Sequence, residues 1–151
     1  MYGVNKISSE QDVMLISFTD IDSKKLSLSA ALLLFARNDI VVDMICQSAP
    51  RGGLLDYSFT TEYKYFDKVL KTVASYKNSA PLFSSGYSKI NLFGEEMVNT
   101  CGVAARALET LEKSNIEIFM ITTSDLDISL LLRDEDEDTA LKALSKAFVL
   151  L

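Results

Sequence analysis

A repeated pattern of residues constrains this chain of 151 residues more than any other feature, because a duplicated pattern indicates a duplicated structural unit. Residues of the segment 40–48 recur in the segment 116–124, and each matched pair has the same separation in sequence (the offset) as Ile40 and Ile116. The matched pairs are Ile40 and Ile116, Met44 and Met120, Ile45 and Ile121, and Ser48 and Ser124. The sequence therefore encodes one small fold twice.

The same offset also relates two predicted helices. In each copy, apolar residues have the i, i+3, i+4, i+7 spacing of one helix face, and the two sets are separated by this offset. These residues are Leu28, Ala31, Leu32 and Phe35 in the first copy, and Ala104, Ala107, Leu108 and Leu111 in the second. Beyond the segment 49–54 the offset becomes shorter, and Asp56 then matches Asp127. That segment is rich in proline and glycine, as turns are, so an insertion there leaves the flanking strands intact.

Each copy is predicted to form a strand, a helix, a hairpin of two strands and a second helix. In the first copy the expected ranges are 13–19, 28–37, 40–48, 55–61 and 63–76. In the second copy they are 89–93, 102–113, 116–124, 126–132 and 137–148. This order predicts an α+β fold of two ferredoxin-like βαββαβ units, each a four-stranded antiparallel sheet with its helices on one face.

Two side-chain patterns support this assignment. In the segment 126–132, leucine and isoleucine alternate with Asp127 and Ser129, which is typical of a strand with one buried face. The apolar residues that are expected to face the helices are Leu126, Ile128, Leu130 and Leu132. On the predicted helix 63–76, the expected buried stripe is Phe66, Val69, Leu70 and Val73.

A four-stranded unit needs a closing strand after its second helix, and the two copies differ in this respect. The first copy has a candidate over 81–85, whereas the second reaches Leu151 shortly after its helix. The unassigned strand is Tyr2–Ile7, at the other end of the chain. We therefore expect the units to be interlocked by exchange of this terminal strand. The predicted domains are 8–86 for the first unit, and 87–151 together with 2–7 for the second.

Composition excludes several classes of function. The chain has no histidine and two cysteines, so it lacks the commonest general base and metal ligand and cannot form a cysteine zinc site. We predict no catalytic residue, no metal site and no cofactor. The net charge of −6 repels phosphate backbones, which argues against a nucleic-acid partner. No apolar run approaches the ~20 residues of a membrane helix, and no signal peptide is visible, so we expect a cytoplasmic protein without a membrane partner.

The residues of both copies resemble a known family. Gly102–Arg106, a helix and then the segment 114–129 resemble the second ACT domain of aspartate kinases. The segments 40–48 and 55–60 resemble the first ACT domain, and the two ends of the chain are similar to the ends of that regulatory region. The resemblance covers essentially the whole chain. It implies a regulatory module that binds lysine, threonine or a related amino acid where ACT units meet, in a homodimer.

The resemblance also implies which residues contact the effector. A loop before a helix offers backbone N–H groups and the positive end of the helix dipole to the ligand's carboxylate, and the next strand takes the ammonium group. In the second unit the implied residues are Thr100, Cys101, Gly102, Val103 and Ala104, with Ile116 and Glu117 opposite. In the first unit they are Lys25, Leu26, Ser27 and Leu28, followed by Ile40, Val41, Asp43 and Gln47.

The sequence departs from the family's pattern at three of these positions. Leu26 stands where the family usually has a glycine, and its side chain hinders close approach of a ligand to the backbone. Val41 stands where an asparagine usually meets the ligand's amino group, and Cys101 where proline is usual. Asp43 is either a ligand contact or the solvent-facing residue of an alternating strand, and Cys101 is either a reactive thiol or a small residue in a tight loop.

Three functional interpretations remain at this stage. The first is an amino-acid sensor that controls a separately encoded aspartate kinase or another enzyme of aspartate-family amino acid biosynthesis. The second is a structural dimerisation subunit of an aspartate kinase that binds no effector, and the third is a fragment of a full kinase. The chain has no phosphate-binding glycine loop, so it is not expected to phosphorylate aspartate itself. The acidic run 134–138 lacks the spacing of a calcium loop and is interpreted as the start of a helix.

Overall fold

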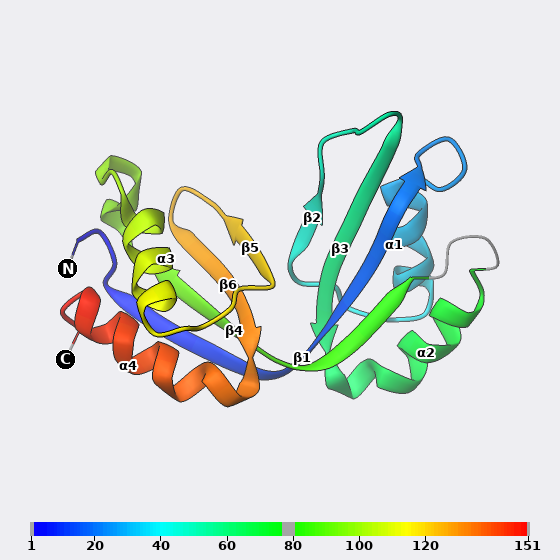
Figure 1. Ribbon diagram of the computed structural model, residues 1–151. Coiled ribbons are helices and arrows are strands. Elements are labelled where there is room, and N and C mark those ends of the chain that lie inside the picture. The colour runs from blue at the N-terminus through cyan, green and yellow to red at the C-terminus, as the bar shows by residue number, and fades with distance from the viewer. Residues whose placement is uncertain (1, 77–80, 151) are drawn as a thin grey trace. The chain divides into compact units, whose positions relative to one another are not determined.

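The computed structural model describes residues 2–76 and 81–150, which form helices packed on antiparallel strands (Figure 1). The elements are β1 (Lys6–Asp22), α1 (Leu28–Arg37), β2 (Ile45–Gln47), β3 (Leu54–Glu62), η1 (Tyr63–Tyr65), α2 (Phe66–Ala74), β4 (Leu82–Phe93), η2 (Glu95–Asn99), α3 (Val103–Lys113), β5 (Met120–Thr123), β6 (Asp127–Arg133), η3 (Asp134–Asp136) and α4 (Glu137–Ala147). The predicted α+β class and ferredoxin-like order are confirmed.

The chain forms two compact units, and the division falls inside two long strands. One unit, here called the first unit, is Asp12–Ser85, and the other, the second unit, combines Met1–Gln11 with Gly86–Leu151. Met1, residues 77–80 and Leu151 lie outside the described residues. The strand order is β2-β3-β1-β4-β6-β5. The first unit therefore contains β2, β3, the later part of β1 and the start of β4. The second unit contains β5, β6, the start of β1 and the later part of β4.

The strand exchange predicted from the sequence is confirmed, with different strand boundaries. The residues before Asp12 belong to the second unit, and the backbone N–H of Asn5 donates to the carbonyl oxygen of Phe93 in β4. The separately predicted strands 2–7 and 13–19 are one strand of 17 residues that begins at Lys6, not at Tyr2. The predicted strands 81–85 and 89–93 are likewise one strand, β4. Strands that were expected to be separate are therefore joined, and β1 and β4 each serve both units.

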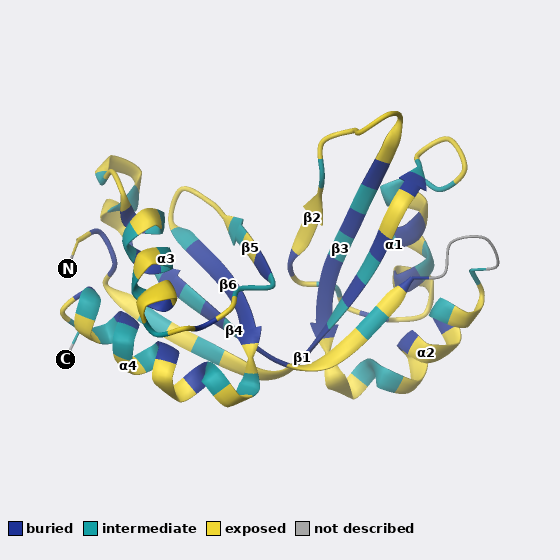
Figure 2. Cartoon of the chain, in the orientation of Figure 1, coloured by how far each residue is buried: buried dark blue, intermediate teal, exposed yellow. Residues whose placement is uncertain are grey.

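Each unit has its own apolar core between its helices and one face of its strands (Figure 2). In the first unit, α1 begins where the Ser27 hydroxyl accepts a hydrogen bond from the N–H of Ala30, and it buries Ala31 and Phe35. In the second unit, α3 and α4 cover β4 and β6. The buried residues of that core are Val4, Ile90, Leu92, Val103, Ala107, Leu111, Ile116, Ile128, Leu130, Leu132, Ala140, Leu144 and Phe148.

Four detailed predictions were wrong. The strand predicted over 116–124 is confined to Met120–Thr123, and the one over 40–48 to Ile45–Gln47. The backbone N–H groups of Ile40 and Ile116 donate to carbonyl oxygens of the preceding helices, those of Phe35 and Leu111, and so do not pair with a strand. On α2, Leu70 is exposed and Thr72 is buried. In β6 the polar face is not open to solvent, since Ser129 is buried beside a fully buried Leu131, while Leu126 is exposed.

A buried carboxylate joins the exchanged strand to the second unit. Glu137, the first residue of α4, accepts hydrogen bonds from the Ser9 hydroxyl (2.5 Å) and the Gln11 amide (2.6 Å). It also shares the single hydrogen of the Ser88 hydroxyl (3.1 Å) with Asp134, which lies closer at 2.6 Å. Burial raises the pKa of Glu137, but these three hydrogen bonds outweigh burial and leave its pKa below the ordinary value of 4.5. The acidic run 134–138 thus begins a helix, as predicted, and one of its members is an internal anchor.

Candidate functional site

The site is built on the N-terminus of α3 in the second unit. Gly102 precedes the helix in a left-handed conformation (φ 82°, ψ 10°), which glycine adopts without the steric cost of a side chain. Its carbonyl oxygen accepts the first helical hydrogen bond, from the N–H of Arg106 at 2.9 Å. Within the described part of the chain no side chain caps α3, and its first turn holds no acidic residue. The first N–H groups of this helix are therefore available to a ligand.

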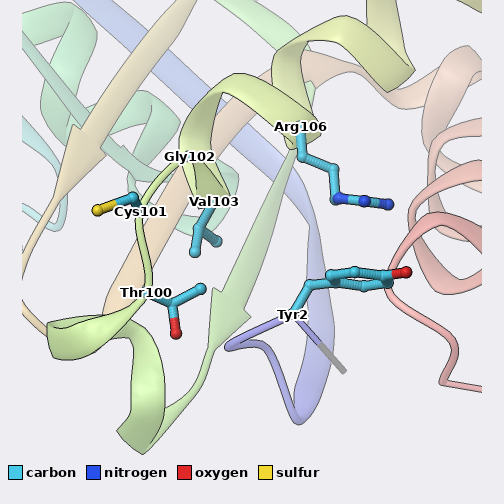
Figure 3. Close-up of a pocket in the computed structure, with 6 residues that line it drawn as sticks. All are labelled: Tyr2, Thr100, Cys101, Gly102, Val103 and Arg106. Atoms are coloured by element: carbon cyan, nitrogen blue, oxygen red, sulfur yellow. The ribbon is translucent and has the colours of Figure 1, made fainter.

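A cavity of about 280 Å³ adjoins this helix start (Figure 3). Its lining comes from the loop before α3, from the first turn of α3 and from the N-terminal segment of the chain. The lining residues are Tyr2, Thr100, Cys101, Gly102, Val103 and Arg106. Four of the five loop residues that the resemblance implied for the second unit therefore lie around one cavity.

The N-terminal segment is held against the α3 loop by close backbone contact. A Cβ placed on Gly3 would lie 3.1 Å from Cβ of Thr100 and 3.2 Å from Cγ2 of Val103. A Cβ on Gly94 would overlap the carbonyl oxygen of Gly3. Glycine at these positions lets the exchanged segment pass close to the loop, and this contact makes Tyr2 a wall of the cavity.

Among the described residues that line the cavity, Arg106 supplies the one charged group, and two contacts fix its position. Its guanidinium carbon lies 3.7 Å from the ring centroid of Tyr2, and the two groups are stacked in Figure 3. Its Nη1 also donates a hydrogen bond to the carbonyl oxygen of Ala147, at the end of α4, at 3.0 Å. A guanidinium has five N–H donors, so these contacts orient the group and leave it able to bind an anion.

The remaining residues implied for the second unit do not line this cavity. Ala104 packs against the apolar core, and Ile116 is a buried member of that core. Glu117 is exposed. Thr100, which does line the cavity, donates its hydroxyl hydrogen bond to the carbonyl oxygen of Glu96 at 2.8 Å. The structure thus brings together the loop before the helix but not the residues at the start of the next strand.

The corresponding loop of the first unit bonds to its own chain. The backbone N–H groups of Lys25 and Leu26 donate to the carbonyl oxygen of Asp22, at 2.9 and 3.0 Å. The Ser27 hydroxyl caps α1, and the Tyr57 hydroxyl donates to the carbonyl oxygen of Leu26 at 3.2 Å. The side chains of Leu26 and Leu28 pack against the core. This loop therefore satisfies its polar groups internally.

The other first-unit residues are spread over different environments. Ile40 is buried in the core, whereas the side chain of Val41 is 64% exposed and its carbonyl oxygen accepts a hydrogen bond from Thr61. The backbone N–H of Asp43 donates to the carbonyl oxygen of Thr60 at 2.9 Å, and Gln47 is an exposed residue of β2. The side chain of Ile40 therefore has no face open to a ligand.

Sequence reasoning missed two residues of the cavity, Tyr2 and Arg106. Each carried a signal. Arg106 lies four residues after Gly102, which is about one helical turn. Because helical side chains tilt towards the N-terminus, the sequence places the side chain of Arg106 near the same loop. Tyr2 belongs to the segment that was assigned to the second unit, but a strand assignment gave no indication that this residue turns towards α3.

Other site types find no support in the described residues. Residues 2–76 and 81–150 contain no group of three or more cysteine, aspartate or glutamate side chains that could hold a metal ion. Among the same residues, no helix is both long and apolar enough to span a membrane. The two cysteines that the structure describes, Cys46 and Cys101, are free thiols and are exposed.

Comparisons with known proteins agree with the geometry. The model of the ACT domain family matches residues 90–148, which contain α3 and its strands. An aspartokinase of Corynebacterium glutamicum is 30% identical over 154 aligned residues, and one from a Bacillus species is 27% identical. These alignments cover 98% and 97% of this chain but 36% and 37% of the relatives, so the chain spans a little over a third of their length.

Solved structures match the whole chain. The regulatory subunit of aspartate kinase from Thermus thermophilus, in a ligand-free form, has a TM-score of 0.87 and covers 97% of this chain and 99% of its own. At 22% identity it establishes the fold alone. A structure of aspartokinase alpha and beta subunits is 27% identical with a TM-score of 0.85, covering 96% of this chain and 98% of the other. The predicted resemblance to this regulatory region is confirmed.

Proposed function

We propose that this chain, which resembles the tandem ACT regulatory region of aspartate kinases along its whole length, is an amino-acid-binding regulatory module. In this proposal it senses lysine, threonine or a related amino acid and controls an enzyme of aspartate-family amino acid biosynthesis. It acts as a homodimer, and its natural target is a separately encoded aspartate kinase. It regulates that enzyme without a catalytic residue, metal or cofactor of its own.

The observation that carries the proposal is the cavity at the N-terminus of α3. Free helical N–H groups and the positive end of the helix dipole favour a carboxylate there, and the guanidinium of Arg106 lines the same cavity. Gly102 allows the ligand to approach the backbone. The cavity volume of about 280 Å³ is near the lower end of the range for small-molecule sites, which suits a single amino acid.

Calorimetric titration of the purified chain with lysine, threonine and methionine tests this proposal. We expect saturable heat for at least one amino acid, together with a rise in melting temperature, because a ligand that binds only the folded state stabilises it by about 2.7 kcal/mol at 100 times its dissociation constant. Gly102→Val is the matched variant, since a β-branched residue cannot adopt the φ of 82° without strain. Binding that is unchanged in this variant would place the ligand elsewhere.

The proposed target enzyme is supported by the likeness to the two-subunit aspartokinase. A pull-down with aspartate kinase catalytic polypeptides, with and without the effector, tests it directly. We expect retention of the kinase and a change in its rate of aspartate phosphorylation when the amino acid is added. A chain that binds the amino acid but neither retains the kinase nor alters its rate would leave the sensor in place and refute this target.

A second candidate is a structural dimerisation subunit that binds no effector. The first unit favours it, because its loop is internally bonded and it exposes large apolar side chains, including Leu33 (49%) and Val41 (64%). Burial of such side chains against a second copy of the chain would contribute to the stability of a dimer. A dimer in sedimentation, with no heat and no thermal shift for any of the amino acids tested, would favour this candidate over the sensor.

A further inference from the structure

We propose that the outward face of α1, in the first unit, is the surface through which two copies of this chain associate, with α1 of one copy against α1 of the other. The matching face of α3, in the second unit, takes no part in this contact. The inference rests on the proposed function only in taking the chain to form a homodimer. It goes further by naming the surface and the residues that form it.

The first observation is that α1 has an apolar stripe on each of two opposite sides, one buried and one exposed (Figure 2). The stripe that packs on the core of the first unit consists of Leu28, Ala31, Leu32 and Phe35. The other, here called the outward stripe, has the i, i+3, i+4 spacing of one helix face and consists of Ala30, Leu33 and Leu34. Leu33 is 49% exposed, Ala30 is exposed and Leu34 is half-buried. A helix that is apolar on both sides is typical of one that is covered on both sides.

The second unit provides an internal comparison, because α3 occupies the place of α1 in the duplicated fold. By the offset that relates Ile40 to Ile116, the outward stripe corresponds to three polar residues, Arg106, Glu109 and Thr110. Glu109 forms an ion pair with Lys113 at 2.7 Å, as on an ordinary solvated helix surface. The apolar outward stripe is therefore a property of the first unit and not a requirement of the fold.

The outward stripe suits a second copy of the same chain because it is self-complementary. In a two-fold dimer the same surface patch is used by both copies, so each contact occurs twice. Two α1 helices that run antiparallel, centred between Leu33 and Leu34, place these leucines against each other. The aliphatic part of Arg37 of one copy can then cover the small Ala30 of the other. Burial of these apolar groups stabilises the contact.

The charges at the two ends of α1 are complementary in the same arrangement. Lys24 and Lys25 lie in the exposed loop before the helix, and Asp39 lies just after it and is also exposed. An antiparallel pair brings Asp39 of each copy towards the lysines of the other, which gives this opposite-charge contact twice. A parallel pair would set the lysines of the two copies side by side. The charges therefore favour the antiparallel, two-fold arrangement.

The length of α1 predicts a weak dimer. The helix has 10 residues, whereas a standard interface takes about 20–30 residues from each partner. We therefore expect a dissociation constant of about 1–100 µM, in the range of transient complexes.

Sedimentation velocity of the full chain, from about 1 µM to about 1 mM, tests the inference. We expect the native chain to pass from monomer to dimer over this range. Leu33→Glu gives α1 the residue type that α3 has at the same place, and it should weaken the dimer at least about 100-fold, since an unpaired charge is buried twice. Glu109→Leu is the reverse exchange on α3. It is the matched control and should leave the dissociation constant within about 2-fold of the native value.

An exchange of charges guards against loss of folding. Lys25→Asp and Asp39→Lys should each weaken the dimer about 2- to 10-fold, because each removes an exposed opposite-charge contact on both sides of the two-fold axis. The double variant restores that contact with its partners exchanged, so its dissociation constant should return to within about 2-fold of the native value. A variant that had merely lost its fold would not be rescued by a second substitution.

Three results would overturn the inference: a native chain that stays monomeric up to about 1 mM, a dimer that Leu33→Glu leaves intact, or a double variant no tighter than the single ones. Each would leave the amino-acid binding of the proposed function standing. Calorimetric titration of the same samples separates the two proposals. If lysine, threonine and methionine gave no heat with a chain whose dimer is lost in Leu33→Glu, the sensor would be refuted and this interface supported.

Discussion

The two loops that precede the first helix of each unit occupy matching places in a duplicated fold, and they differ in where their polar groups are bonded. In the first unit, Ser27 caps α1 with its own side chain, and the neighbouring backbone groups bond to Asp22 and Tyr57. In the second unit, Gly102 leaves the N-terminus of α3 uncapped beside a cavity. One copy has closed its helix terminus, and the other has kept it open.

The comparison shows how little sequence separates a ligand loop from a structural loop. By the offset that relates Ile40 to Ile116, Leu26 of the first unit corresponds to Gly102 of the second, and Ser27 to Val103. The leucine packs on the core and the serine caps the helix, which removes both the space and the free N–H groups that a carboxylate needs. The duplication preserves the fold, and these two positions assign the proposed binding role to the second unit.

Deletion of residues 1–8 should have the largest effect on the difference between the units, because the cavity of the second unit depends on this exchanged segment. The deletion removes Val4, which is fully buried, and Ile7, which packs on the same core. Burial of a valine or isoleucine contributes about 1.5–3 kcal/mol, so the free energy of unfolding should fall by at least about 3 kcal/mol in urea denaturation. Val41→Ala, at an exposed position, should cost less than about 0.5 kcal/mol. An unchanged melting curve for the deletion would refute the exchange.

Glu137→Gln tests a second difference between the units, at the start of the second helix of each. The shorter offset, which relates Asp56 to Asp127, places Phe66 of the first unit opposite Glu137. Phe66 packs against the rings of Tyr63 and Phe83 instead of accepting hydrogen bonds. In the variant, a glutamine amide cannot accept all the hydrogen bonds that three side chains donate to the carboxylate of Glu137. We expect a loss of about 2 kcal/mol in stability at pH 7, measured by urea denaturation, as for hydrogen bonds to a charged group.

The same variant carries a pH test. Because the pKa of Glu137 is lower in the folded chain than its ordinary value of 4.5, its contribution is present above pH 4.5 and is lost as the pH falls below 4.5 through the folded pKa. The difference in stability between the native chain and Glu137→Gln should therefore shrink in acid. Val41→Ala, at an exposed position without an ionisable side chain, is the control and should show no such change. A difference that stays constant from neutral pH into acid would contradict the anchor.

Ser27→Ala has the smallest expected effect and tests whether the first loop is purely structural. Loss of an N-cap side chain costs about 1 kcal/mol, whereas Ser27→Gly should cost only a few tenths. Neither variant should change amino-acid binding if the second unit holds the site. Thermal denaturation and calorimetric titration of both variants measure the two effects, and a binding defect in Ser27→Ala would return the first unit to the role of a ligand site.

Much of the fold could be predicted from the sequence because the repeat and the helical spacing are local signals. The helix predicted over 28–37 has the same boundaries in the structure, since its apolar spacing and Ser27 are both readable. The strands were predicted less well. Ile40 and Ile116 look like strand residues, but their backbone N–H groups bond to the ends of the preceding helices. Strand pairing begins later and depends on partners that sequence spacing does not reveal.

The candidate site was predicted in part for a similar reason. The loop Thr100–Val103 could be assigned from its resemblance to a family and from the place of Gly102 before a helix. Tyr2 and Arg106 meet through tertiary contact between distant parts of the sequence, as does the bond from Arg106 to Ala147. No pattern in one sequence indicates such a contact, so the charge of the cavity emerged only with the structure.

Amide chemical shifts measured during an amino-acid titration test the central claim most directly, because they report on both loops in one sample. We predict saturable shifts for the N–H groups of Gly102, Val103 and Ala104, and for Tyr2, with no change at Ser27 and Leu28. Shifts that are concentrated at Ser27 and Leu28, or that are absent from both loops at saturating ligand, would contradict the assignment of the binding site to the open helix terminus of the second unit.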